Sequence, residues 1–199
     1  MITLRMARRA QPVLVLHALA LPVLVLLASA PVRAQDWVLD KAQSHIGFTG
    51  TQTGTRFAGE FGRYDGEIAL DPAHPESGHI EVTIDLASAH TGDTQRDTAL
   101  PGADWFDVAQ FPKARFVSTA IRSVGEKHYE ALGTLSLRNV TRPVTLRFTL
   151  EAKDGNAHAQ GQADLVRTAF GVGQGPWASG QWVALEVGVT FDLVAHGKK

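Results

Sequence analysis

The chain has 199 residues, with 19 Lys and Arg against 20 Asp and Glu, and 44% of its residues are hydrophobic. These proportions are typical of one ordinary globular domain. The absence of cysteine excludes disulfides, a thiol nucleophile, a cysteine-ligated metal cluster and a lipidated N-terminal cysteine. The net charge of −1 gives no electrostatic reason to expect a nucleic acid partner.

The first 34 residues have the pattern of a secretory signal peptide. They contain four arginines and no acid, and no charge occurs from Ala10 to Val32. These 23 uncharged residues would also be long enough for a membrane anchor, but three prolines and a histidine interrupt them. We therefore expect cleavage after Ala34, between small residues and Gln35, and an exported mature domain of residues 35–199.

Alternation of apolar and polar residues predicts β-strands along most of the body. The alternation is longest at 183–193 and recurs at 80–86, 129–137 and 144–150, as expected for antiparallel strands with one buried face. Weaker candidates lie at 45–50, 57–70, 115–124 and 156–166. About eight strands predict an all-β fold, either an up-and-down barrel or a two-sheet sandwich. Side chains fill an eight-stranded barrel, or it holds one small ligand.

The connection at 87–113 lacks the strand pattern and is too long to be a simple turn. Asp93 is placed to cap a short helix that ends before Pro101-Gly102. Asp104 is placed to cap a second turn that carries Trp105 and Phe106. We therefore expect one or two short helical turns in this connection.

A second gap in the strand pattern, at 167–181, is rich in glycine around Phe170 and Trp177. Aromatic side chains on such strand-free segments suggest a plug or lid over one end of a barrel.

Searches for catalytic and metal-binding motifs find little. The chain has no Gly-x-Ser-x-Gly nucleophile elbow and no His-Glu-x-x-His pair. His74 and His79 share one loop, which is more typical of a solvated segment than of a metal site. We predict no metal and no resident cofactor.

Three residues leave alternative roles open. Asp97 and Asp107 are candidates for an acid–base pair, or for a helix cap and an ion pair that fix the long connection, with Arg96 beside them. Arg167 is placed to pair with one of these acids, or to offer a cation at the barrel mouth to an anionic or phenolic head group.

The order and spacing of several motifs resemble the YceI-like family across 37–193. The matching segments are 39–48, 59–61, Thr91, Arg96-Asp97, Leu100, Trp105-Phe106-Asp107, Phe111-Pro112, Phe116, 133–137, 140–144, Arg167 and Phe170-Gly171. The resemblance implies a lipocalin-like, eight-stranded antiparallel barrel in the periplasm that binds an isoprenoid lipid, either a polyprenyl chain or a quinone. It also implies an association with membrane b-type cytochromes. Many relatives carry a histidine after the first strand, where this chain offers the neutral Gln52.

From this resemblance we expect an apolar cavity with polar residues at its mouth. The expected lining residues are Phe48, Phe57, Phe106, Phe116, Leu135, Phe148 and Phe170. The expected polar residues at the mouth are Gln52, Arg96, Asp97, Asp107 and Arg167.

Three functions follow as alternatives. The preferred one is a non-catalytic carrier of an isoprenoid lipid. An interaction or sensing module for a membrane b-type cytochrome would instead have a filled barrel and an exposed apolar patch around Trp105, Trp177 and Trp182. An enzyme would use Asp97 and Asp107. Self-association into a homodimer stays open.

Overall fold

A computed structural model describes residues 34–198 of the chain. The predicted signal peptide falls on residues 1–34, so all of it except Ala34 lies outside the described residues. No helix among the described residues is both long enough and apolar enough to cross a membrane.

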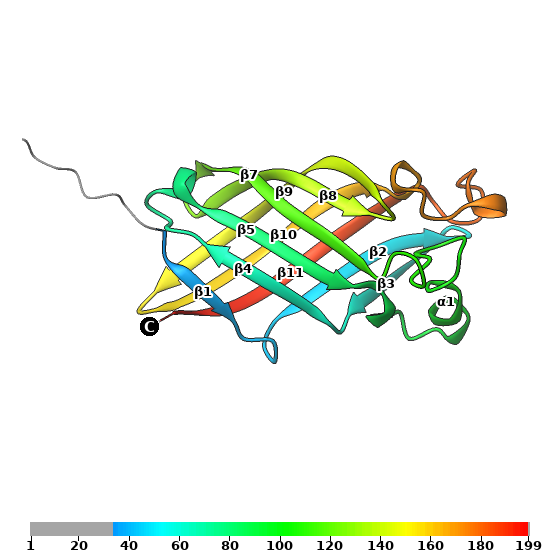
Figure 1. Ribbon diagram of the computed structural model, residues 1–199, viewed down its shortest axis with the longest axis horizontal. Helices are drawn as coiled ribbons and strands as arrows, with labels where there is room; N and C mark the ends of the chain where they lie inside the picture. Colours follow the sequence, from blue (N-terminus) through cyan, green and yellow to red (C-terminus); the bar gives the residue numbers. More distant parts are fainter. Residues whose placement is uncertain (1–33, 199) are drawn as a thin grey trace, which may run out of the picture. The chain divides into compact units, whose positions relative to one another are not determined.

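One antiparallel sheet of eleven strands forms the body of residues 34–198 (Figure 1). The strands are β1 (Asp36–Leu39), β2 (His45–Gln52), β3 (Thr55–Phe61), β4 (Tyr64–Ala69), β5 (His79–Asp85), β6 (Ala89–His90), β7 (Lys113–Gly125), β8 (His128–Leu137), β9 (Val140–Lys153), β10 (Asn156–Val166) and β11 (Glu186–Gly197). The helical elements are α1 (Thr94–Ala99) and the short 3-10 turns η1 (Pro75–Ser77), η2 (Leu86–Ser88), η3 (Arg167–Phe170) and η4 (Gly175–Trp177).

The eleven strands occupy eight positions of a closed barrel. β11 pairs with β1 along one part of its length and with β2 along another. On their other edges, β1 pairs with β4 and β2 pairs with β3. β5 and β6 then pair with β4 and β3. Each of these three pairs of short strands is therefore one interrupted barrel strand, and the pairing of β1 with both β4 and β11 closes the sheet. The predicted eight-stranded barrel is confirmed, and the sandwich alternative is wrong.

The break between β1 and β2 has a local cause. The Asp40 side chain accepts a hydrogen bond from the Ala42 amide at 3.0 Å, so the chain turns instead of extending. The Ser44 hydroxyl then takes the place of a backbone partner in the ladder. It accepts from the Val194 amide at 3.0 Å and donates to the Val194 carbonyl at 3.2 Å. Tyr64 supports the break by donating to the Ser44 carbonyl at 2.7 Å.

The inward faces of the strands form two apolar clusters. One surrounds Phe61 and Phe106, near the long connections, and the other surrounds Tyr129 and Phe148, in the opposite half of the barrel. Ala131, in the middle of β8, is completely buried. The period-two alternation therefore identified the inward faces correctly.

Both segments without strand pattern lie at the same end of the barrel (Figure 1). The first predicted helix is confirmed as α1, and the Asp93 side chain caps it by accepting from the Arg96 amide at 2.9 Å. This helix confirms the expected one or two short helical turns, and Trp105 and Phe106 lie in hydrogen-bonded turns that follow α1. Asp104 acts there through its backbone carbonyl, which accepts from the Gly173 amide at 2.7 Å and the Gln174 amide at 2.8 Å.

The last strand begins later than its sequence pattern indicates. Val183 occupies an inward position in the alternating pattern of 183–193. It nevertheless makes only an isolated bridge with Gln52, and β11 starts at Glu186. The carbonyls of Val183 and Ala184 accept hydrogen bonds from the Arg167 side chain, so they are not available to a strand ladder.

Candidate functional site

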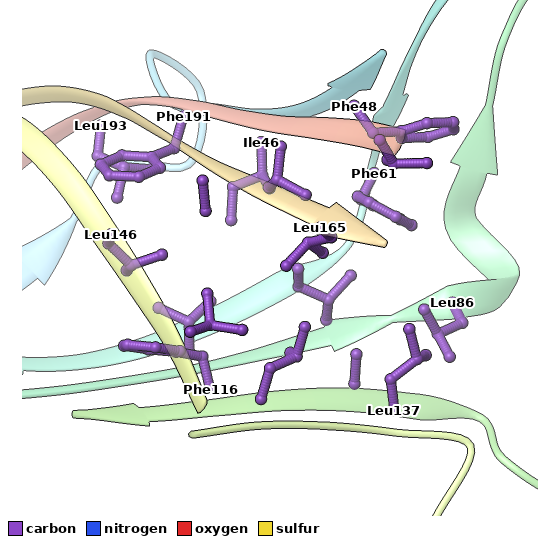
Figure 2. A pocket seen from close by; sticks show the side chains of 18 of the residues that line it. Ile46, Phe48, Phe61, Leu86, Phe116, Leu137, Leu146, Leu165, Phe191 and Leu193 are labelled. Atoms are coloured by element: carbon purple, nitrogen blue, oxygen red, sulfur yellow. The ribbon is translucent and has the colours of Figure 1, made fainter. Parts of the chain in front are cut away.

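An apolar cavity extends along the interior of the barrel (Figure 2). Its volume is about 230 Å³, and its wall runs from Trp37 and Leu70 at one end to Trp105 and Val172 at the other. Arg167 is the only charged residue among the described residues that line it. Such a cavity can hold a long hydrocarbon chain, because burial of apolar surface is its main source of binding energy.

The structure places all seven predicted lining residues in the wall of this cavity: Phe48, Phe57, Phe106, Phe116, Leu135, Phe148 and Phe170. Their role in ligand binding stays a prediction. Sequence reasoning missed most of the aliphatic wall, including Leu146, Leu165 and Leu193 (Figure 2). The same alternation would have found them, since each lies in a strand at an inward position.

The interior is open because the side chains do not fill it. Leu146, Ala159 and Phe191 point inward and line the cavity, yet they are only partly buried. β10 contributes small inward residues along its length, and Gly161 is one of them. A β-carbon at Gly161 would lie 2.5 Å from the Phe191 ring, so the missing side chain is what allows this ring to lie against the wall.

Two connections cover the end of the barrel opposite β1. The indole rings of Trp105 and Trp177, one from each connection, have centroids 5.6 Å apart. Arg138, in the β8–β9 turn, donates from Nη1 to the Ala103 carbonyl at 2.8 Å and also to the Trp105 carbonyl. The tryptophan pair joins the two connections into one lid, and Arg138 fixes the first connection to the β8–β9 turn.

Arg167 holds the second connection from inside. Its Nε donates to the Ala184 carbonyl at 2.9 Å, and its four terminal N–H groups donate to carbonyls at 2.5–3.3 Å. Those four acceptors are Val172, Gly173, Trp177 and Val183. All five N–H hydrogens therefore have acceptors. Burial lowers the pKa of the Arg167 guanidinium.

The structure bears on one of the two alternatives left open for Arg167, and a contact with a ligand head group stays a prediction. Among residues 34–198, no carboxylate forms an ion pair with it, so the predicted pairing with an acid is wrong. It does line the cavity, with its guanidinium 5.4 Å from the centroid of the Trp105 ring. A direct hydrogen bond to a ligand head group would require the loss of one of its backbone acceptors.

Gly173 makes this arrangement sterically feasible. Its φ of +80° is in the left-handed region, and a β-carbon there would lie 1.9 Å from Nη1 of Arg167. Glycine is therefore required at this position, both by conformation and by the close approach of the guanidinium.

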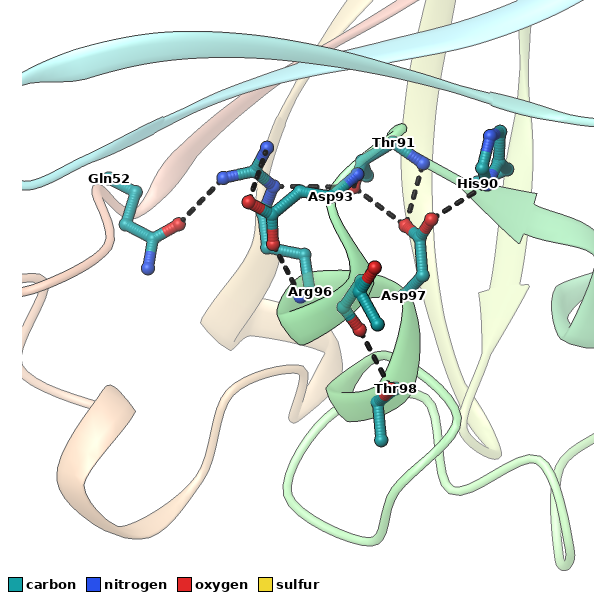
Figure 3. A network of polar contacts seen from close by, with 8 residues as sticks. Gln52, His90, Thr91, Asp93, Arg96, Asp97 and Thr98 are labelled. Atoms are coloured by element: carbon teal, nitrogen blue, oxygen red, sulfur yellow. Dashed lines mark hydrogen bonds and ion pairs between the residues drawn. The ribbon is translucent and has the colours of Figure 1, made fainter.

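Asp97 and Arg96 belong to a polar network at the start of the first connection (Figure 3). The Asp97 carboxylate accepts from the Thr91 hydroxyl at 2.6 Å and from the Thr91 amide at 2.7 Å, and His90 Nδ1 lies 2.7 Å from it. The hydrogen bond from Thr91 is the main cause of a lowered pKa for Asp97. This network anchors α1 to the barrel.

Arg96 extends the network to Gln52 on β2. Arg96 Nη1 donates to Gln52 Oε1 at 3.1 Å, and its guanidinium lies 4.6 Å from the centroid of the Phe57 ring. Its acidic neighbour is Asp93, at 3.7 Å, rather than Asp97. Gln52 and Arg96 thus connect α1 to the β2–β3 hairpin, and neither lines the cavity.

The two acids proposed as a catalytic pair have separate roles. Asp107 is 9% exposed, has a positive φ, and accepts from the Gln110 side chain at 3.0 Å. Neither Asp97 nor Asp107 is part of the cavity wall. The geometry thus favours the structural alternative, in which both fix the long connection.

Comparison with known proteins identifies this architecture. The family model described as the YceI-like domain matches residues 37–195. A UPF0312 protein of Pseudomonas syringae pv. tomato is 36% identical over 188 residues, which cover 90% of this chain and 96% of that protein.

Solved structures give the same result. The crystal structure of BcnA from Burkholderia cenocepacia is 32% identical, with a TM-score of 0.76, and the match covers 79% of this chain and 99% of that one. A polyisoprenoid binding domain from Saccharophagus degradans has the same fold at 15% identity, with a TM-score of 0.62, over 82% of this chain and 99% of that one. The chain therefore belongs to the YceI-like family.

Proposed function

We propose that the mature protein is a periplasmic carrier that binds an isoprenoid lipid, a polyprenyl chain or an isoprenoid quinone, inside the barrel. The observation that carries this proposal is the open apolar cavity, which runs from Trp37 to Val172 and is lined, within residues 34–198, by a single charged residue. The description of the Saccharophagus degradans neighbour as a polyisoprenoid binding domain supports it.

The energetics are compatible with reversible loading. A chain of about 40 carbons transferred from water would gain about 30 kcal/mol at ~0.8 kcal/mol per CH₂. This gross term exceeds the practical limit of roughly 20 kcal/mol for non-covalent affinity. The relevant competitor is a bilayer, in which the tail is already out of water. The net preference for the cavity is therefore small, as a carrier that loads and unloads requires.

The alternatives are less well supported by the geometry. A sensing module for a membrane b-type cytochrome would need no space in the barrel, whereas this interior is open. An acid–base enzyme would need its carboxylates to face the ligand, and Asp97 and Asp107 lie outside the cavity wall.

Native mass spectrometry of the protein purified from the periplasm, followed by solvent extraction, tests the proposal. We expect a stoichiometric adduct that the extract identifies as a polyprenyl lipid or an isoprenoid quinone. A protein without an adduct, which also takes up neither lipid from vesicles or detergent solution, would overturn it.

A further inference from the structure

The second connection contains the longest uncharged segment of the mature chain. No charged side chain occurs from 168 to 185, between Arg167 and Glu186. In the structure this segment lies at the lid end of the barrel, in orange in Figure 1. Trp182 exposes 50% of its surface there, although a large aromatic residue is normally well buried.

Part of the backbone of this segment is already hydrogen-bonded within the protein. Arg167 occupies the carbonyls of Val172, Gly173, Trp177, Val183 and Ala184. Removal of water from an unpaired backbone group is costly. These carbonyls can therefore lose water at little cost when the loop meets another surface.

The β2–β3 hairpin turn extends the same surface. The Thr53 amide donates to the Trp182 carbonyl at 2.8 Å, and the Ala184 amide donates to the Thr51 carbonyl at 2.9 Å. Residues 53–55 are exposed and uncharged. We call residues 168–185 and 53–55 together the neutral rim.

Charged side chains border the neutral rim, namely two exposed arginines and the exposed Glu186. Arg56 follows the hairpin turn, and Arg142 donates from Nε to the Ala169 carbonyl at 3.4 Å. An exposed tryptophan on an uncharged surface, with cationic side chains at its edge, is the combination that the interface of a lipid bilayer favours. The indole ring partitions to the head-group level, and arginine is attracted to anionic head groups.

We propose that the neutral rim docks on the surface of a phospholipid bilayer, with Trp182 inserted among the head groups. The lid end of the cavity then faces the membrane, so that a lipid can pass between the two without crossing water. The purpose of docking rests on the proposed function, because a carrier has to reach the membrane that holds its ligand. The docking itself is measured without any ligand.

The test is binding of the unloaded mature protein to protein-free vesicles of phosphatidylethanolamine and phosphatidylglycerol, by co-sedimentation. Trp182→Ser is compared with Val38→Ser, since Val38 is 54% exposed but lies on β1, at the opposite end. We expect Trp182→Ser to weaken vesicle binding by about tenfold, because half of a large aromatic surface is no longer available for burial. Val38→Ser should bind like the unmodified protein.

A second pair of variants keeps the tryptophan. Ala178 is exposed in the rim, and Ala178→Glu should weaken binding to these anionic vesicles, whereas Ala178→Lys should preserve or strengthen it. Brominated phospholipids should quench the fluorescence of the unmodified protein more than that of Trp182→Ser. The proposal would be overturned if Trp182→Ser and Val38→Ser bound equally well, or if the unmodified protein did not bind protein-free vesicles. Binding only to vesicles that contain a membrane protein would also overturn it, and would assign the rim to that protein.

Loading from detergent solution separates this proposal from the carrier function. Trp182→Ser should take up an isoprenoid lipid from detergent as well as the unmodified protein does, since Trp182 does not line the cavity. If vesicle binding follows the predicted pattern but no lipid is taken up, the carrier function fails and the docking surface stands.

Discussion

Substitution of Ala159 by leucine tests whether the barrel interior is an open binding site. Ala159 lies in β10, opposite Leu150 and Leu193 of the neighbouring strands, and it is partly exposed to the cavity. The new side chain adds three carbon atoms in the ligand's space. At ~0.8 kcal/mol per displaced CH₂, a ligand loses about 2.4 kcal/mol, which is roughly a fiftyfold weaker affinity.

The stability of the same variant gives the decisive second measurement. Extra carbons in a fully packed core typically destabilise a protein by about 1–3 kcal/mol. In an open cavity of about 230 Å³, the leucine has space, so we expect the free energy of unfolding to fall by less than about 1 kcal/mol.

The assay pairs isothermal titration with a short, water-soluble isoprenoid alcohol and urea unfolding of the ligand-free protein. Gln162→Leu is the matched control, because Gln162 is on the same strand with its side chain exposed; it should leave affinity and stability unchanged. A strongly destabilised Ala159→Leu would refute the open interior. Unchanged affinity with unchanged stability would refute binding inside the barrel.

Three further predictions concern the lid. Arg167→Met should lower the free energy of unfolding, measured by urea titration, by about 3 kcal/mol. This figure is about 1 kcal/mol for each of three buried carbonyls that lose their donor. An unchanged urea midpoint would show that water replaces the guanidinium freely. Gly173→Ala should cost about 2 kcal/mol through strain and displacement of Arg167, whereas Gly155→Ala, with a similar φ and an open surrounding, should cost less. Asp97 has a lowered pKa in the folded state, so its contribution is complete at neutral pH. It is lost as the pH falls below the ordinary pKa of an aspartate and through the lowered pKa of the folded state. Asp97→Asn should thus destabilise the protein at pH 7 and reduce the difference between pH 7 and pH 3, as acid titrations would show.

The sequence carried enough information for the barrel but not for its interruptions. Period-two alternation depends only on which face of a strand is buried, and it identified inward residues such as Phe148 and Ala131 directly. The break near Ser44 depends on a side chain that replaces a backbone hydrogen bond with Val194, a residue distant in sequence. The repeating pattern of apolar residues does not record such bonds.

Arg167 shows the same limit at the candidate site. A charged residue just before the glycine-rich gap at 167–181 suggested a carboxylate or a ligand head group as its partner, because charge is what the sequence displays. Its actual acceptors are five backbone carbonyls. Every residue has a backbone carbonyl, so the sequence does not indicate which of them will bind a side chain. The sequence did contain one related signal, the glycine at position 173. Glycine allows a close approach to the backbone, and the Arg167 guanidinium makes that approach here.

The open interior follows from a conflict between hydrophobic collapse and barrel geometry. Eight strands fix the wall at a roughly constant radius, so the core cannot contract around small side chains as a helical bundle does. Ala159 on β10 leaves space that its neighbours cannot reach without breaking the ladders with β9 and β11. An unfilled cavity of this kind lowers stability, and a bound apolar chain restores the missing contacts. The residues that weaken the packing of the empty barrel are therefore the ones that favour a ligand inside it.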